Sequence, residues 1–110
     1  MSAASPTDFS HLQAAAGQAA TLLKALSNPD RLLILCQLAQ GELNVGELES
    51  RTGIRQPTLS QQLTVLREGQ LVNTRRDGKQ MFYRVASAQA LAVLQVLYQL
   101  YCPDDEGDTP

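Results

Sequence analysis

The stretch Gln56-Pro57-Thr58-Leu59-Ser60-Gln61-Gln62-Leu63 decides the fold of this chain. Its leucines Leu59 and Leu63, together with Leu66, recur at steps of four and three residues, which places them on one face of a helix that ends near Gly69. Pro57 suits the first position of that helix, because the first N–H groups of a helix have no partner within it. The opposite face is polar, and we expect it to point outward.

Two elements flank this helix. A shorter helix over Gly46 to Arg51 precedes it and ends at Gly53. Strand-like runs over Leu71 to Arg75 and Gln80 to Val85 follow it, and they enclose an Asp77-Gly78 pair, which predicts a β-hairpin with a type I′ turn. Helix, glycine turn, helix and hairpin in this order predict a winged helix-turn-helix. In such a fold the second helix enters the major groove of DNA, and the hairpin lies along the neighbouring backbone or minor groove.

Two further helices precede this motif. Apolar residues recur at three- and four-residue steps over about Phe9 to Leu26, which predicts the first helix. Asn28 as an N-cap and Pro29 at the first helical position favour the start of a second helix. This helix is apolar nearly all round, so it is expected to be the central core helix. It runs to about Ala39, where Gly41 can end it in a left-handed conformation.

The last predicted helix runs from Ser87 to Cys102 and is apolar on more than one face. Such a helix cannot have its own domain on one side and water on the other, so it needs a second partner surface. For a small protein, a second copy of the chain is the simplest partner. The sequence therefore predicts a mainly α fold with a small β-hairpin wing and a homodimeric assembly.

The chain has 110 residues, of which 44% are hydrophobic and 18% are charged. This length and composition predict one packed domain, which we place at residues 9–102, between a disordered N-terminus at 1–8 and a disordered acidic tail at 103–110. No apolar run approaches the roughly 20 residues that span a bilayer. The start has neither the basic nor the apolar region of a secretion signal. We therefore expect a cytoplasmic protein with no membrane partner.

Charge is distributed unevenly along the chain. The formal net charge is −2, but residues 51–84 carry seven basic residues against two acidic ones. Such a segment is either an electrostatic footprint for nucleic acid or a solvated, salt-bridged face. Its place on the predicted helix and hairpin, among short polar side chains that can contact base edges, favours DNA. The predicted DNA-binding residues are Arg55, Gln56, Thr58, Ser60, Gln61, Gln62, Thr64, Arg67, Arg75, Arg76, Lys79 and Gln80.

Five stretches stand in order along the chain. They are Ala25-Leu26-Ser27-Asn28-Pro29-Asp30-Arg31-Leu32, Gly46-Glu47-Leu48, Gln56-Pro57-Thr58-Leu59-Ser60-Gln61-Gln62-Leu63, Leu66-Arg67-Glu68-Gly69-Gln70-Leu71-Val72 and Arg75-Arg76-Asp77-Gly78-Lys79-Gln80-Met81-Phe82-Tyr83. Together they resemble the ArsR/SmtB family of bacterial winged-helix repressors, and the likeness spans most of the chain between Leu22 and Cys102. The resemblance implies a homodimer held by the first and last helices. It also implies binding to an inverted repeat of double-stranded DNA in a promoter, with release when an inducer arrives.

The inducer is a separate question. Metal-sensing members of the family carry cysteines near the start of the helix-turn-helix, or Asp and His ligands on the last helix. In this chain Asn44 stands where the first of those cysteines would be, and the last helix has no His or Asp. His11 is the only histidine, and we expect it to be a surface residue. A metal or metalloid sensor with ligands from Cys36, Cys102 or His11 is the alternative hypothesis.

Cys36 and Cys102 are the only cysteines. Both are expected to be reduced at rest, so they are either inert or redox-active, and Cys36 among leucines resembles a small hydrophobic residue. However, Leu35-Cys36 and Tyr101-Cys102-Pro103 resemble the dithiol branch of the family, the BigR, SqrR and HlyU-type regulators. That resemblance implies that the two cysteines form a sensing pair. Reactive sulfur species or oxidants would join them by a disulfide or polysulfide, and the operator would be released. No cofactor is predicted.

Two other functions, a thiol-dependent enzyme and a protein-binding winged helix, predict different properties. A thiol-dependent enzyme needs a base beside its cysteine, and no His or acidic motif stands near either cysteine, so we predict that the chain is not an enzyme. A winged helix that binds protein instead of DNA would keep its activity without Arg75 and Arg76. A DNA-binding protein with the same change would have a lower affinity for DNA, and that affinity would depend less steeply on salt concentration.

Overall fold

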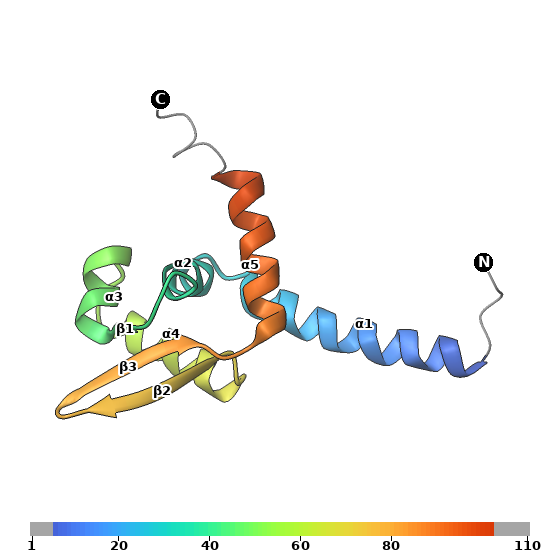
Figure 1. The fold of residues 1–110 in the computed structure, drawn as a ribbon, viewed down its shortest axis with the longest axis horizontal. Helices are drawn as coiled ribbons and strands as arrows, with labels where there is room; N and C mark the ends of the chain where they lie inside the picture. The colour runs from blue at the N-terminus through green and yellow to red at the C-terminus, as the bar shows by residue number, and fades with distance from the viewer. Residues whose placement is uncertain (1–5, 103–110) are drawn as a thin grey trace.

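The chain folds into helices and a small antiparallel sheet, which lies at one edge of the molecule (Figure 1). This structure is a computed structural model that describes residues 6–102, with side chains from residue 9 onward. Its elements are α1 (Pro6–Leu26), α2 (Pro29–Leu38), β1 (Leu43–Asn44), α3 (Val45–Thr52), α4 (Thr58–Glu68), β2 (Val72–Asp77), β3 (Gln80–Val85) and α5 (Ala88–Tyr101). The predicted winged helix-turn-helix, mainly α with a β-hairpin wing, is confirmed. None of the described helices is both long and apolar enough to cross a membrane.

Helix α2 starts and ends close to the predicted residues. Asn28 is its N-cap, with a side-chain oxygen that accepts a hydrogen bond from the N–H of Arg31 (3.0 Å), and Pro29 is the first helical residue. The helix stops at Leu38 with Ala39 as its C-cap, within one residue of the predicted end, but the predicted left-handed cap at Gly41 was wrong. Gly41 has a φ of 155°, outside the left-handed helical region, and its N–H bonds to the carbonyl of Leu38 (3.1 Å). Gly41 therefore allows the chain to leave the turn with a positive φ, and it is not the C-cap of the helix.

The turn between α3 and α4 contains the predicted glycine. Gly53 is left-handed, with a φ of 76°, and ends α3. Helix α4 begins at Thr58, so Pro57 is the N-cap and not the first helical residue as predicted. The reason is local, because the Oε1 atom of Gln56 accepts a hydrogen bond from the N–H of Ser60 (3.0 Å). This side chain satisfies a free helical N–H that the proline cannot reach.

The wing is a three-stranded sheet in the order β1-β3-β2. The extended piece predicted at Glu42 to Val45 contributes β1, which pairs with β3. The type I′ turn was a wrong prediction, because Asp77 pairs with Gln80 and the turn residues are Gly78 and Lys79. Only Gly78 of these two has a positive φ (66°). A type I′ turn requires a positive φ at both positions, whereas glycine in the first position suits a type II′ turn.

Helix α1 begins at Pro6, three residues before the expected start at Phe9. Proline is tolerated in the first turn because its missing N–H has no helical partner there. Three residues of the predicted disordered N-terminus at 1–8 are therefore helical. The rest of that segment and the predicted acidic tail at 103–110 lie outside the described residues. Helix α1 extends away from the other elements (Figure 1), and its residues 9–21 are exposed.

The core lies between α2, α3, α4, the sheet and the first half of α5. The predicted stripe of α4 is confirmed, since Leu59, Leu63 and Leu66 are all buried. Ile34 and Leu35 are fully buried on α2, which makes it the central helix as predicted. Because the apolar face of α4 is used up by this core, its polar face is left at the surface.

Candidate nucleic-acid interface and cysteine pair

The outward face of α4 is polar and exposed. Ser60, Gln61, Thr64 and Arg67 follow one another at the spacing of one helix face, and each is exposed. Arg55, in the turn before α4, is exposed as well. The hydroxyl of Thr64 donates to the carbonyl of Ser60 (2.9 Å), so its oxygen is left as an acceptor. This face combines hydroxyl, amide and guanidinium groups, which suit base edges and phosphates.

Three of the predicted DNA-binding residues at α4 make contacts within the chain or are half-buried. Gln56 caps α4, as described above, and Thr58 is half-buried in the first turn. Gln62 is half-buried and lies toward α2, where its Oε1 atom accepts a hydrogen bond from Nη1 of Arg31 (3.1 Å). The helical spacing of α4 separates its apolar side from the rest. It does not show which polar residues at the border turn inward.

Arg31 is a connecting residue that sequence reasoning missed. Its Nε donates to the carbonyl of Ala25 (2.8 Å) and its Nη2 to the carbonyl of Lys24 (3.4 Å), both in the last turn of α1. With the bond to Gln62, one guanidinium joins α1, α2 and α4. The last carbonyls of a helix always need such partners. Which side chain supplies them cannot be read from periodicity.

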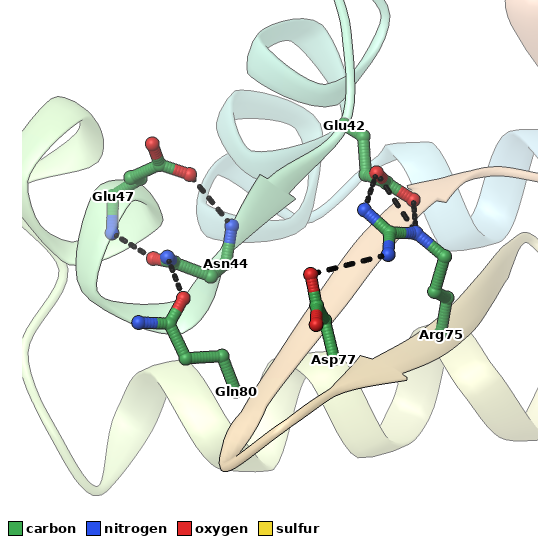
Figure 2. A network of polar contacts seen from close by, with 6 residues as sticks. All are labelled: Glu42, Asn44, Glu47, Arg75, Asp77 and Gln80. Atoms are coloured by element: carbon green, nitrogen blue, oxygen red, sulfur yellow. Dashed lines mark hydrogen bonds and ion pairs between the residues drawn. The ribbon is translucent and has the colours of Figure 1, made fainter.

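The wing carries its basic residues in two different states. Arg76 and Lys79 are exposed, and neither side chain makes a hydrogen bond or ion pair within the described residues. Arg75 instead pairs with Glu42, and its Nη2 lies 2.7 Å from Oε1 of that carboxylate. Gln80 accepts a hydrogen bond from Nδ2 of Asn44 (2.8 Å). Figure 2 shows both contacts, which join the wing to the start of α3 and the segment before it.

Asn44 has two roles, of which only the cap could be read from the sequence. Its side-chain oxygen accepts from the N–H of Glu47 (2.8 Å), and the Glu47 carboxylate accepts from the N–H of Asn44 (2.9 Å), which makes a capping box at α3. Its amide nitrogen also holds Gln80 (Figure 2). The pattern of an Asn followed three residues later by a Glu was a readable signal for the cap.

Cys36 and Cys102 come from neighbouring elements. Cys36 is on α2, Cys102 directly follows α5, and these two helices are in contact. Both cysteines are free and half-buried. Burial raises the pKa of the Cys36 thiol above its ordinary value, and the charge of Cys102 raises this pKa further. The two thiols are therefore within electrostatic range of each other, on two helices that are in contact.

A pocket of about 520 Å³ lies beside Cys36, between α2 and α5. It is also lined by the uncharged side chains of Gln40 and Gln95. His11 is exposed on α1, as predicted. Within the part of the chain that the structure describes, no three side chains among His, Cys, Asp and Glu come together as a metal site.

An exposed polar helix behind a glycine turn, next to a hairpin with free basic side chains, defines a winged helix-turn-helix regulator. Comparison with known proteins identifies the group. The model for "Bacterial regulatory protein, arsR family" matches residues 28–74. Two relatives that cover 84% and 88% of the chain are 53% and 42% identical to it. The chain belongs to the arsR family of bacterial regulatory proteins.

Two relatives show the branch of the family that this chain resembles. The biofilm growth-associated repressor of Agrobacterium fabrum is 53% identical over 92 residues, which cover 84% of this chain and 79% of the relative. The transcriptional activator HlyU of Vibrio cholerae is 42% identical over 97 residues, which cover 88% and 90%. Both names describe regulators of transcription, and the chain is accordingly not an enzyme.

Two solved structures are similar in fold. The transcriptional repressor BigR from Xylella fastidiosa has a TM-score of 0.80 and 50% identity, with 84% of this chain and 95% of that chain covered. A homodimeric winged helix-turn-helix DNA-binding domain from Mycobacterium bovis has a TM-score of 0.67 and 34% identity, with 94% and 92% covered. The predicted resemblance to BigR and HlyU-type regulators is confirmed.

Proposed function

We propose that this chain is a cytoplasmic, homodimeric transcriptional repressor whose affinity for DNA is controlled by its two cysteines. In the reduced state, α4 and the wing bind an inverted repeat in a promoter. Reactive sulfur species or oxidants join Cys36 to Cys102, and the repressor then leaves its operator. The observation that supports this proposal is the contact between α2, which carries Cys36, and α5, which Cys102 directly follows, with both thiols free and half-buried.

The proposed DNA contacts follow from exposure and chemistry. Gln61, Ser60 and Thr64 face outward from α4 and suit base edges, with glutamine best matched to adenine. Arg55, Arg67, Arg76 and Lys79 surround them and suit phosphates. The remaining predicted residues, Gln56, Thr58, Gln62, Arg75 and Gln80, make internal contacts or are half-buried, so we assign them to holding α4 and the wing in place.

Dimerisation through α1 and α5 is supported by their exposed apolar side chains. Leu12 and Phe9 on α1 are 65% and 57% exposed, and Leu100 and Tyr101 on α5 are 66% and 79% exposed. The contact of α1 with α2 includes its last turn, through Arg31, whereas residues 9–21 are exposed, and most of the stability of a helix in a protein comes from packing of its apolar face. Packing against a second copy would cover these residues and give α1 its missing contacts.

The proposed sulfur chemistry needs no metal or cofactor. With a persulfide donor, one cysteine thiolate attacks the outer sulfur of the donor, and the donor leaves as a thiol. The second cysteine thiolate then attacks the inner sulfur of the new persulfide and expels hydrosulfide, which leaves a disulfide. If a further donor sulfur is added first, the bridge is longer. With peroxide, one thiolate attacks an oxygen and becomes a sulfenic acid, and the hydroxide that leaves takes up a proton from solvent to give water. Condensation of the sulfenic acid with the second thiol forms the disulfide and releases another water.

A bridge between α2 and α5 would act on α4 through existing contacts. Helix α2 contacts α1, α4 and α5. Arg31 on α2 also holds Gln62 of α4 and the end of α1. A bridge that moves α2 against α5 would therefore change the distance between the two recognition helices of a dimer, which must match half-sites about one helical turn apart.

The test compares DNA binding by reduced, persulfide-treated and peroxide-treated protein. The probe is a fluorescent duplex that the reduced protein enriches from a random-sequence library. We expect release after treatment, together with an intact-mass change that matches a Cys36–Cys102 bridge. Cys36→Ser and Cys102→Ser should bind as reduced wild type does and should not release. Release by either variant, or release of wild type without a bridge, would contradict the proposal.

A further inference from the structure

The guanidinium of Arg75 contacts two carboxylates and one aromatic ring. Its Nη2 and Nε donate to the Glu42 carboxylate at distances between 2.7 and 3.2 Å. Its Nη1 lies 3.7 Å from Oδ2 of Asp77, and its guanidinium carbon lies 4.7 Å from the centre of the Phe82 ring. Figure 2 shows the guanidinium between the two carboxylates. Arg84 on β3 also acts electrostatically on Glu42, so the two carboxylates are balanced by two guanidinium groups. The donors of Arg75 are already directed at carboxylates, which leaves it less available to a phosphate than the unpaired Arg76.

The contact of Arg75 with Glu42 crosses the sheet. Arg75 lies on β2 and pairs in register with Phe82 on β3, while Glu42 directly precedes β1 on the far side of β3. The guanidinium therefore lies over the central strand and ties one edge of the sheet to the other. Its hydrogen bond lowers the pKa of Glu42, so this carboxylate stays charged, and the ion pair is kept, to a lower pH than for an unpaired glutamate.

The wing has a second attachment near its tip, where Gln80 accepts from Asn44. An isolated two-stranded hairpin is marginally stable in water. The hairpin extends well beyond the helices (Figure 1), so its direction depends on such attachments. Arg76, the next residue along β2, points to the opposite face because strand side chains alternate, and it is exposed.

We propose that Arg75 is a positioning residue that fixes the direction of the wing through Glu42, and that Arg76 and Lys79 supply the wing's phosphate contacts. This inference rests on the proposed DNA binding. It separates two adjacent arginines that sequence alone treats as equivalent. The assignment predicts different salt dependence for the two, because only a phosphate contact releases counterions from DNA.

The test uses a variant that removes the ion pair without changing net charge, Glu42→Gln with Arg75→Gln. Its matched control is Arg76→Gln. Affinity for the selected inverted-repeat duplex is measured over a series of salt concentrations. Arg76→Gln should reduce the slope of log affinity against log salt by about 1.8, because a dimer loses two phosphate contacts. The double variant should lose about fivefold in affinity, consistent with exposed ion pairs in two wings, and should keep the wild-type slope.

A charge-swapped variant, Glu42→Arg with Arg75→Glu, provides the rescue. It restores an ion pair at the same place, so its affinity should recover relative to the uncharged double variant. Amide hydrogen exchange of residues 75–82 in the free protein should be faster in the uncharged variant and slower again in the swapped one. General unfolding would instead speed exchange across the core.

Two outcomes overturn the inference. A fall in slope of the double variant equal to that of Arg76→Gln would make Arg75 a phosphate contact. Unchanged affinity and unchanged hairpin exchange would show that the ion pair positions nothing. If wild type enriches no duplex, the proposed function fails instead, and the exchange experiment still decides whether Arg75 holds the wing.

Discussion

The body of the molecule and its two arms differ in how their apolar residues are covered. The body consists of α2, α3, α4, the sheet and the first half of α5, and most of its leucines are buried within one chain. The arms are residues 9–21 of α1 and 95–101 of α5, where Phe9, Leu12 and Leu100 are exposed. The body is therefore complete as a single chain, whereas the arms need a second surface. Folding and assembly should respond to different substitutions.

Truncation of a core residue in the body should have the largest effect. Leu48 on α3 is fully buried, and Leu48→Ala should lower the free energy of unfolding by about 3 kcal/mol, since it removes methyl groups and leaves a cavity. Chemical denaturation of dilute, dissociated protein measures this. The matched control is Leu100→Ala in an arm, which should leave the monomer's unfolding free energy within about 0.5 kcal/mol of wild type. Equal losses for the two variants would remove the distinction between body and arms.

A charge in an arm should weaken assembly. Leu12→Glu places a carboxylate in the proposed dimer interface, which should cost about 2 kcal/mol of association free energy, or more than tenfold in the dimer dissociation constant. Sedimentation across a concentration series measures this constant. Ser50→Glu on α3 adds the same charge at an exposed position of the body and should leave the constant unchanged. A dimer that tolerates Leu12→Glu must use another surface.

The cysteine pair spans the two regions, so its titration sharpens their relation. The raised pKa of Cys36 means that its reactive thiolate forms at higher pH than in an exposed cysteine, whose pKa is about 8.5. The rate of alkylation of Cys36, followed site by site by mass spectrometry, should therefore reach its midpoint above that pH. Cys102→Ser should lower the midpoint without restoring the ordinary value, because burial is the larger cause. A midpoint at or below that of the denatured protein would contradict the described surroundings.

The smallest expected effect concerns the backbone at the end of α4. Gln70 has a φ of 61°, a left-handed conformation in which a side chain is strained. Gln70→Gly should raise the free energy of unfolding by about 0.5–1 kcal/mol, because relief of this strain exceeds the added flexibility of the unfolded chain. Gly53→Ala is the opposite case, since Gly53 already has a φ of 76° and alanine would be strained there. If both variants have a lower free energy of unfolding than wild type, the backbone at Gln70 is not strained.

Local patterns were sufficient to predict the elements and their order. The Asn28 cap, the buried leucines of α4 and the hairpin all follow from neighbours within a few residues. The errors were also local, and they arose where side chains competed for a role, as when Gln56 capped α4 in place of the expected proline start. The hairpin turn lies one residue later than predicted for a backbone reason, because Gly78, with its positive φ, takes the first turn position.

The candidate site was predictable only in part. The outward face of α4 and the free basic residues of the wing follow from periodicity and charge. The partners of Gln62 and Arg75 lie 31 and 33 residues earlier in the chain, so no local pattern reveals them. Hydrogen bonds between distant segments depend on the packing of whole elements. These bonds decide which polar residues stay available at the surface and which hold the fold.

The capping box at Asn44 also bears on how this chain could change in evolution. Asn44 holds the first turn of α3 through Glu47 and the wing through Gln80, at the position where metal-sensing members of the family have a cysteine. A cysteine there would remove both the oxygen that caps α3 and the amide that holds β3 through Gln80. A change of chemistry at this one position would therefore disturb two elements of the fold at once.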